Sequence, residues 1–271
     1  MIRLDGNNLA AFRGAGVAGT VQSVAGCELF GAARWPSWAN PYLPYSKAAG
    51  EALVAQFPTQ WPTIRDYGFA HPALVPFINE DPMLVMSLID GLGTRWLVGD
   101  GASLIDLGIK LGTGSKTLAA FKYIVNPVNN KSLLAGVNVQ QIHYNQYLYY
   151  QYQGTWNSTG MSMAKDTEYE IETSLMQGSQ YIKVNGVIKK TTTSGGTQEP
   201  TTNTCIFSYS PEGTGTEVTC KFAKAWLNGE LVRDMVPFIS QTQGMGMLDL
   251  VNGVFHENKG TGSFTISESP A

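Results

Sequence analysis

Short runs in which apolar and polar residues alternate recur along the chain from about residue 94 onward. They are rich in β-branched and aromatic residues, and Gly, Asn, Pro or Ser separates them at the spacing of an all-β sandwich or barrel. Asn-Gly dipeptides at 185–186, 228–229 and 252–253 lie between such runs and are strong signals for β-hairpins. The pattern predicts strands at 96–98, 105–109, 117–125, 132–137, 144–153, 168–175, 180–184, 187–190, 204–209, 217–227, 230–237, 246–249 and 253–255.

The first third of the chain lacks this regularity. Glycines interrupt short β-prone pieces at its start, and farther on eight prolines alternate with aromatic residues. Only residues 46–57 show a helical pattern, with Ser46 in position to cap it, so we expect little regular structure. The aromatic side chains carry enough apolar area that this segment must pack on the sandwich or on a partner chain. The predicted organisation is a β-prone arm or anchor at 1–35, a packing segment at 36–93, a sandwich at 94–267 and a tail at 268–271.

Composition narrows the classes of partner. Charged residues make up 14% of the chain and the formal net charge is -3, which provides no positive field for a phosphate backbone. We therefore expect no nucleic-acid partner. No apolar run approaches the roughly 20 residues that span a bilayer, and the N-terminus shows no secretory leader pattern. We expect no membrane insertion, and any export would use a route without a recognisable signal peptide.

The three cysteines are too few and too scattered to form a disulfide framework. We expect Cys27, Cys205 and Cys220 to be reduced thiols. The alternative is that Cys205 and Cys220 pair across a hairpin that turns near residues 212–213.

The block from Ala225 to Ile266, AWLNGELVRDMVPFISQTQGMGMLDLVNGVFHENKGTGSFTI, resembles the closing block of concanavalin A-like, laminin-G-like lectin and glucanase domains of gut bacteria and their phages. The similar segments are LVRDMVP at 231–237, GMLDLVNGVF at 246–255 and NKGTGSF at 258–264. Weaker similarity extends upstream to about residue 94. The resemblance implies an all-β fold, a jelly-roll sandwich of two antiparallel sheets.

Three acidic residues, Glu168, Glu170 and Glu172, alternate along one predicted strand and so project from one face of it. The pattern resembles the acidic strand of retaining glucanases, in which one carboxylate is the nucleophile and another the proton donor. Here Glu170 stands where those enzymes have Asp, and no tryptophan-rich motif precedes the strand. We interpret the strand as a solvated face and predict no enzymatic activity, with a retaining β-glucanase as the alternative.

A run of aromatic residues offers a candidate carbohydrate site. Its rings could stack on sugars while amides such as Asn145, Gln146, Gln151 and Gln153 bind hydroxyl groups. The alternative is that alternate tyrosines line the core while the glutamines face solvent. The candidate ligand-binding residues are Tyr144, Tyr147, Tyr149, Tyr150, Tyr152 and Trp156.

Metal and nucleophile motifs are missing from the sequence. The three histidines, at 71, 143 and 256, lack metal-ligand spacing, and no Ser or Cys lies in a nucleophile elbow. We expect no cofactor. A calcium site remains an alternative, because sandwiches of the family that this chain resembles bind calcium through loop residues. The corresponding candidates here are Asp100, Asp106, Asp166 and Asp249.

Three features favour a non-catalytic protein of a phage particle, such as a head fibre, tail fibre or decoration at the virion surface. They are the lack of a secretory leader pattern, an aromatic N-terminal segment that needs a partner, and a closing block that resembles those of phage-encoded proteins. In this hypothesis the N-terminal third attaches to other virion proteins, the chain self-associates as a trimer, and the sandwich faces outward toward host or mucosal glycans. The alternative is a bacterial carbohydrate-binding protein that is secreted or displayed on the cell surface.

Overall fold

The computed structural model describes residues 51, 54–71, 74, 77–78, 81, 84–88, 95–152, 155–193, 197, 199–213 and 215–268. The chain divides into two compact units, Met1–Met86 and Ser87–Ala271. The arm expected at residues 1–35, with Cys27, lies outside the described residues, as does Ser46. No helix of the described part is both long and apolar enough to cross a membrane.

Helices occur among the described residues between 61 and 88, where the sequence predicted little regular structure. They include α2 (Trp61–Ala70) and α4 (Leu84–Leu88). Helix α2 tolerates Pro62 because a proline in the first turn forgoes an N–H that has no partner within the helix. Its Trp61 and Ile64 are buried. Pro62 therefore lies at the start of a helix and does not interrupt regular structure. Residues 54–56, within the predicted helix at 46–57, are helical.

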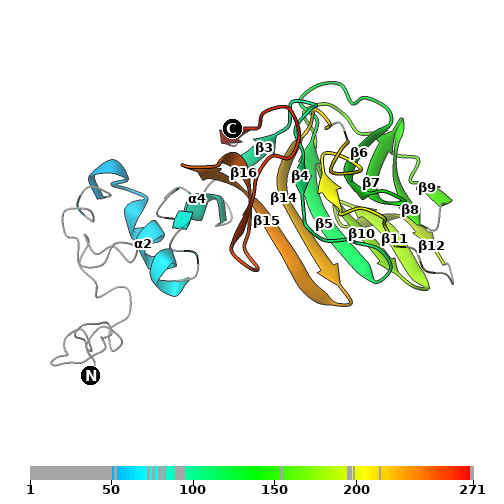
Figure 1. Cartoon of the computed structure of the whole chain (residues 1–271), viewed down its shortest axis with the longest axis horizontal. Coiled ribbons are helices and arrows are strands. Elements are labelled where there is room, and N and C mark those ends of the chain that lie inside the picture. The colour runs from blue at the N-terminus through cyan, green and yellow to red at the C-terminus, as the bar shows by residue number, and fades with distance from the viewer. Residues whose placement is uncertain are drawn as a thin grey trace. The chain divides into compact units, whose positions relative to one another are not determined.

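The second unit is a sandwich of two antiparallel sheets, which confirms the predicted fold class (Figure 1). The ten-stranded sheet runs in the order β12-β11-β10-β5-β14-β15-β16-β17, and β3 pairs with both β14 and β18. Its strands are β3 (Arg95–Val98), β5 (Ser115–Lys122), β10 (Glu168–Met176), β11 (Ser179–Val184), β12 (Val187–Thr192), β14 (Thr219–Leu227), β15 (Glu230–Ser240), β16 (Gly244–Asp249), β17 (Val254–His256) and β18 (Thr265–Glu268).

The six-stranded sheet runs in the order β4-β13-β6-β7-β8-β9. Its strands are β4 (Ile105–Asp106), β6 (Lys131–Gly136), β7 (Val139–Asn145), β8 (Tyr147–Tyr152), β9 (Thr155–Ser158) and β13 (Cys205–Ile206). The core lies between the two sheets and follows the alternation of the strands. In β10, for example, Tyr169 and Ile171 are buried while Glu170 between them is exposed. Phe121 of β5 meets Phe207, just after β13, edge to face at 6.5 Å between ring centroids.

All three predicted Asn-Gly hairpins are confirmed. They connect β11 to β12, β14 to β15 and β16 to β17, each an antiparallel pair. Asn185, Gly186, Asn228 and Gly229 all have positive φ, as a type I′ turn requires.

The single strand predicted at 144–153 is wrong. The chain reverses at Gln146, whose φ is 66°, so β7 ends at Asn145 and β8 begins at Tyr147. A non-glycine residue rarely adopts this conformation, and the turn carries no Gly or Pro to mark it. Consequently Tyr144 and the later tyrosines belong to different strands.

Polar side chains of the closing block, residues 225–266, stabilise the sandwich through hydrogen bonds and an ion contact. The carboxylate of Asp249, fully buried, accepts hydrogen bonds from the backbone N–H groups of Asp234 and Val251, both at 3.0 Å. Its other oxygen lies 3.5 Å from Arg233 Nε. Farther on, Asn258 Oδ1 accepts a hydrogen bond from the N–H of Leu104 at 3.0 Å. The polar residues of the block that resembles lectin domains thus hold the sandwich together.

The two described cysteines do not pair. Cys205 lies on β13 and Cys220 on β14, in different sheets, and both are buried free thiols. Burial raises the pKa of each thiol well above its usual value. Protonated, buried thiols are poor nucleophiles, so both act as small apolar side chains.

Candidate functional site

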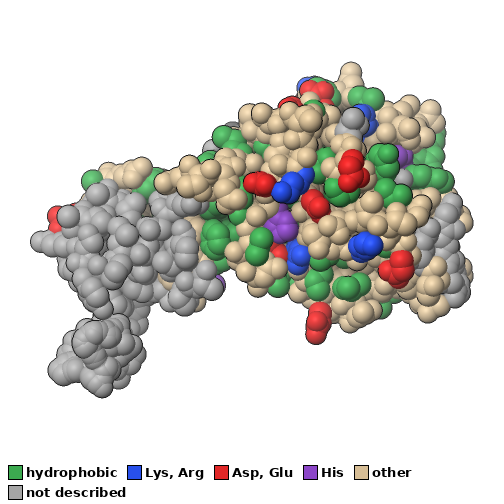
Figure 2. All heavy atoms as spheres, viewed as in Figure 1, with side chains coloured by type: hydrophobic (Ala, Val, Ile, Leu, Met, Phe, Trp, Pro, Cys, Tyr) green, Lys and Arg blue, Asp and Glu red, His purple; other side chains and the backbone are tan. Residues whose placement is uncertain are grey.

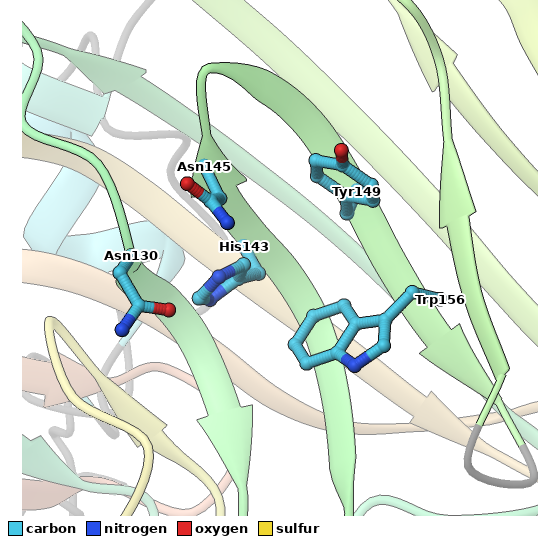
Figure 3. Close-up of a pocket in the computed structure, with 5 residues that line it drawn as sticks. All are labelled: Asn130, His143, Asn145, Tyr149 and Trp156. Atoms are coloured by element: carbon cyan, nitrogen blue, oxygen red, sulfur yellow. The ribbon is translucent and has the colours of Figure 1, made fainter.

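A pocket of about 360 Å³ opens on the face of the six-stranded sheet that points away from the core (Figure 3). Strands β7, β8 and β9 supply most of it, and the segment before β6 supplies the rest. The residues that line it are Asn130, His143, Asn145, Tyr149 and Trp156.

The register of three neighbouring strands brings these side chains together. His143 of β7 lies directly opposite Tyr149 of β8. Tyr149 in turn lies opposite Ser158 of β9, and Trp156 is two positions along the same strand. Since alternate residues of a strand share a face, His143, Tyr149 and Trp156 all project outward, and Asn145 follows His143 on the same side.

Asn130 reaches the pocket through a turn. The N–H of Gln146, at the reversal between β7 and β8, donates a hydrogen bond of 2.6 Å to Asn129 Oδ1. Asn130 itself has a φ of 64°, a conformation that asparagine tolerates better than most residues. This contact fixes the segment before β6 beside the β7–β8 turn.

Trp156 is the most exposed ring in the pocket, with 44% of its surface accessible. The His143 ring lies 4.7 Å from it between centroids, and the Tyr149 ring meets it edge to face at 6.0 Å. Two neighbours therefore support the indole and leave part of its surface free. Figure 3 shows Asn130 and Asn145 at one end of the pocket and the Tyr149 and Trp156 rings at the other.

His143 forms the floor of the pocket and is 5% exposed. Its Nδ1 lies 3.2 Å from Ser132 Oγ on β6. Burial lowers the pKa of His143 to about 4, because the protonated ring is poorly solvated there. At neutral pH the imidazole is uncharged.

The structure divides the six aromatic residues proposed as ligand-binding from sequence. Tyr144, Tyr150 and Tyr152 are buried in the core, so the prediction fails for these three. Tyr147 is 36% exposed but does not line the pocket. Tyr149 and Trp156 are the two that do.

Of the amides proposed with them, Asn145 alone lines the pocket. Gln146 forms the turn, and Gln151 is half-buried on β8. Gln153 lies outside the described residues.

Sequence reasoning missed Asn130 and His143. The signal for His143 was its position two residues before Asn145, which places both on one face of a strand. No local pattern indicated Asn130, since its position depends on the pairing of β6 with β7.

The three glutamates lie on the outer face of the other sheet, where Glu168 and Glu170 are exposed and Glu172 is partly buried. Glu172 Oε1 is 2.7 Å from Lys183 Nζ, and Oε2 is 3.2 Å from Lys116 Nζ. Burial opposes ionisation of Glu172, but its two lysine partners outweigh burial and lower its pKa. Glu168 pairs with Lys221 at 3.1 Å, and Glu170 is exposed. A proton donor needs a raised pKa, so Glu172 is unsuited to that role.

Charges on the sandwich are mixed. On the face shown in Figure 2, lysine and arginine side chains are interspersed with aspartate and glutamate and form no patch of one sign.

The aspartates considered for calcium bind protein groups. Asp100 accepts hydrogen bonds from the N–H groups of Ala102, Ser103 and Ser263. Asp106 accepts one from the N–H of Gly108. Asp166 pairs with Lys165, and Asp249 contacts Arg233. Within the described ranges, no three His, Cys, Asp or Glu side chains are placed to hold a metal ion together.

Comparison with known proteins supports the fold. No family model matches the chain, and no curated protein matches it. A Bacteroides ovatus protein described as a candidate carbohydrate binding protein superposes with a TM-score of 0.50 at 12% identity, over 66% of this chain and 61% of that one. The chain thus spans less than two thirds of that protein.

Two further solved structures overlap less. A Trypanosoma rangeli sialidase, solved with difluorosialic acid, has a TM-score of 0.37 at 15% identity, over 49% of this chain and 25% of the sialidase. An alginate lyase of polysaccharide lyase family 7 has a TM-score of 0.25 at 9% identity, over 49% of this chain and 59% of the lyase. The likeness to the Bacteroides protein shows a shared β-sandwich fold.

Proposed function

We propose that the sandwich is a non-catalytic carbohydrate-binding module and that its site is the pocket around Trp156. The observation that carries the proposal is a supported, partly exposed indole beside two asparagine side chains on one sheet face. The Bacteroides ovatus protein of similar fold, described as a candidate carbohydrate binding protein, is consistent with this function.

The chemistry of the pocket suits a sugar ring. A pyranose presents an apolar C–H face, which packs on an aromatic ring, and hydroxyl groups, which need hydrogen-bond partners. Trp156 and Tyr149 offer ring surface, while the amides of Asn130 and Asn145 offer both donors and acceptors. Because neighbouring rings already hold the indole, binding orders few further side chains and costs little conformational entropy.

We propose no catalytic role for this pocket. Glycoside hydrolysis by the usual route needs two carboxyl groups flanking the scissile bond. None of the five side chains that line the pocket is acidic. The glutamates of β10 lie on the opposite sheet and are largely held in ion pairs.

A glycan array probed with the labelled full chain tests the proposal. We expect saturable binding to a subset of glycans, confirmed by calorimetry with the soluble saccharide. The matched probe is the Trp156→Ala chain at equal concentration. If the wild-type protein binds no glycan above the signal of this variant, the proposal is wrong.

The narrower proposal places this module on a phage particle, with glycan binding directed at the host or its mucosal surroundings. It rests on the resemblance of residues 225–266 to closing blocks common in phage-encoded proteins. Mass photometry of the full chain should then give a species with the mass of three chains. Immunogold labelling with an antibody against this protein should mark the surface of the phage particles. A monomer that is absent from particles would contradict this setting and leave the binding function intact.

A further inference from the structure

We infer that the pocket selects uncharged saccharides and rejects sugars that carry a carboxylate. This inference rests on the proposed function and specifies its ligand class. It follows from the charge of the lining side chains, from the face of β6 on which Lys131 lies, and from the positions of the two arginines of the sandwich.

The lining is uncharged at neutral pH. Two asparagines, a tyrosine and a tryptophan contribute no charge, and His143 stays neutral because burial keeps its pKa at about 4. The side chain that meets the His143 ring nitrogen is the hydroxyl of Ser132, and the ring beside it is Trp156. No group among these can balance the charge of a bound carboxylate.

Lys131 is the basic residue nearest in sequence, directly after Asn130. In the sheet it lies opposite Tyr144, whose side chain is in the core, whereas the next residue, Ser132, lies opposite His143. Alternation along the strand therefore directs Lys131 to the side of the sheet away from the pocket.

Arginine, the side chain best suited to bind a carboxylate in two places, is missing from this sheet. Between residues 95 and 268 the sequence contains two arginines, and both lie on the ten-stranded sheet. Arg95 is buried. Arg233 donates hydrogen bonds to the carbonyl oxygens of Leu107 and Val232.

A carboxylate that enters the pocket therefore loses water without gaining a cation from the five side chains that line it. Hydrogen bonds from amides recover part of that cost, but removal of a charge from water without a partner costs far more than removal of a hydroxyl. We expect neutral sugars to bind at least tenfold more tightly than their carboxylated counterparts.

Matched saccharide pairs test this directly, with calorimetry on the full chain at neutral pH. Two pairs compare a neutral sugar with a related acidic one: lactose with sialyllactose, and mannobiose with dimannuronate. If the array identifies a ligand of higher affinity, the array also supplies its acidic or neutral counterpart as a further pair. Tighter binding of the neutral member supports the inference. Equal or tighter binding of the acidic member overturns the inference while the proposed function stands, whereas binding of neither class on the whole array overturns both.

A gain-of-charge variant provides a second test. Asn145 is exposed at the end of β7, so Asn145→Lys can place an ammonium group at the pocket without disturbing the core. We expect this variant to narrow the ratio between neutral and acidic affinities at least fivefold. Asn145→Gln, which displaces the amide without adding charge, should lower both affinities by a similar factor and not narrow their ratio. If Asn145→Lys leaves the ratio as in the wild type, the charge of the lining does not set the selectivity and the inference is wrong.

Discussion

Replacement of Trp156 by Ala should abolish most of the affinity for a saccharide. A tryptophan side chain has roughly 250 Å² of surface. Its exposed fraction of 44% therefore corresponds to about 110 Å². A sugar stacked on one face covers about half of that area and buries an equal area of its own. At about 25 cal/mol per Å², the variant loses about 2 to 3 kcal/mol of binding free energy. The Kd should rise roughly thirty- to 140-fold.

Isothermal titration calorimetry with the best array ligand measures this change. The control is Trp226→Ala, which removes a half-buried tryptophan from the outer face of the ten-stranded sheet, where Lys116 Nζ lies 4.5 Å from the ring centroid. We expect the control to bind like the wild type. Unchanged affinity of the Trp156 variant, or loss of binding in the Trp226 variant, would refute the location of the site.

Three further predictions concern stability and the alternative site. Because the pKa of His143 falls from about 6.5 in the unfolded chain to about 4 in the folded one, the unfolded state takes up the proton first. The free energy of unfolding should therefore decline as the pH falls from about 6.5 to about 4. In urea titrations the decline should exceed that of His143→Gln by about 2 kcal/mol, a value below the full effect of the pKa difference because solvent in the pocket screens the charge. Asp249→Ala removes the carboxylate beside Arg233 and leaves two backbone N–H groups without their acceptor, and it should cost about 3 kcal/mol by the same titration. Glu257→Ala, in an exposed ion pair, should leave the midpoint unchanged. Glu172→Gln should leave the glycan affinity measured by calorimetry unchanged. Loss of saccharide binding in this variant would instead place the site on the outer face of the ten-stranded sheet, where the three glutamates lie.

Much of the fold could be predicted because its determinants are local. Each Asn-Gly turn needs two adjacent residues that tolerate positive φ, and the sequence displays them directly. In the closing block, the partners Arg233 and Asp249 are brought together by a simple antiparallel pair, β15 with β16. Where pairing follows chain order, the pattern of the sequence is sufficient.

The site could be predicted only in part because its geometry is not local. The reversal at Gln146 depends on a hydrogen bond from its N–H to Asn129, seventeen residues earlier. This reversal decides that Tyr149 faces the pocket while Tyr150 faces the core, and it brings Asn130 beside Asn145. Composition alone could not separate exposed from buried tyrosines in an aromatic run.

The most direct test of the central claim is an NMR titration of the ¹⁵N-labelled full chain with the neutral saccharide of highest affinity. If the pocket is the site, the indole N–H signal of Trp156 and the backbone signals of His143 and Asn145 shift with one common Kd, while the indole signal of Trp226 stays in place. Shifts that centre on Trp226 and Glu172, with the Trp156 signal unmoved, would show that the sandwich binds its ligand on the other sheet.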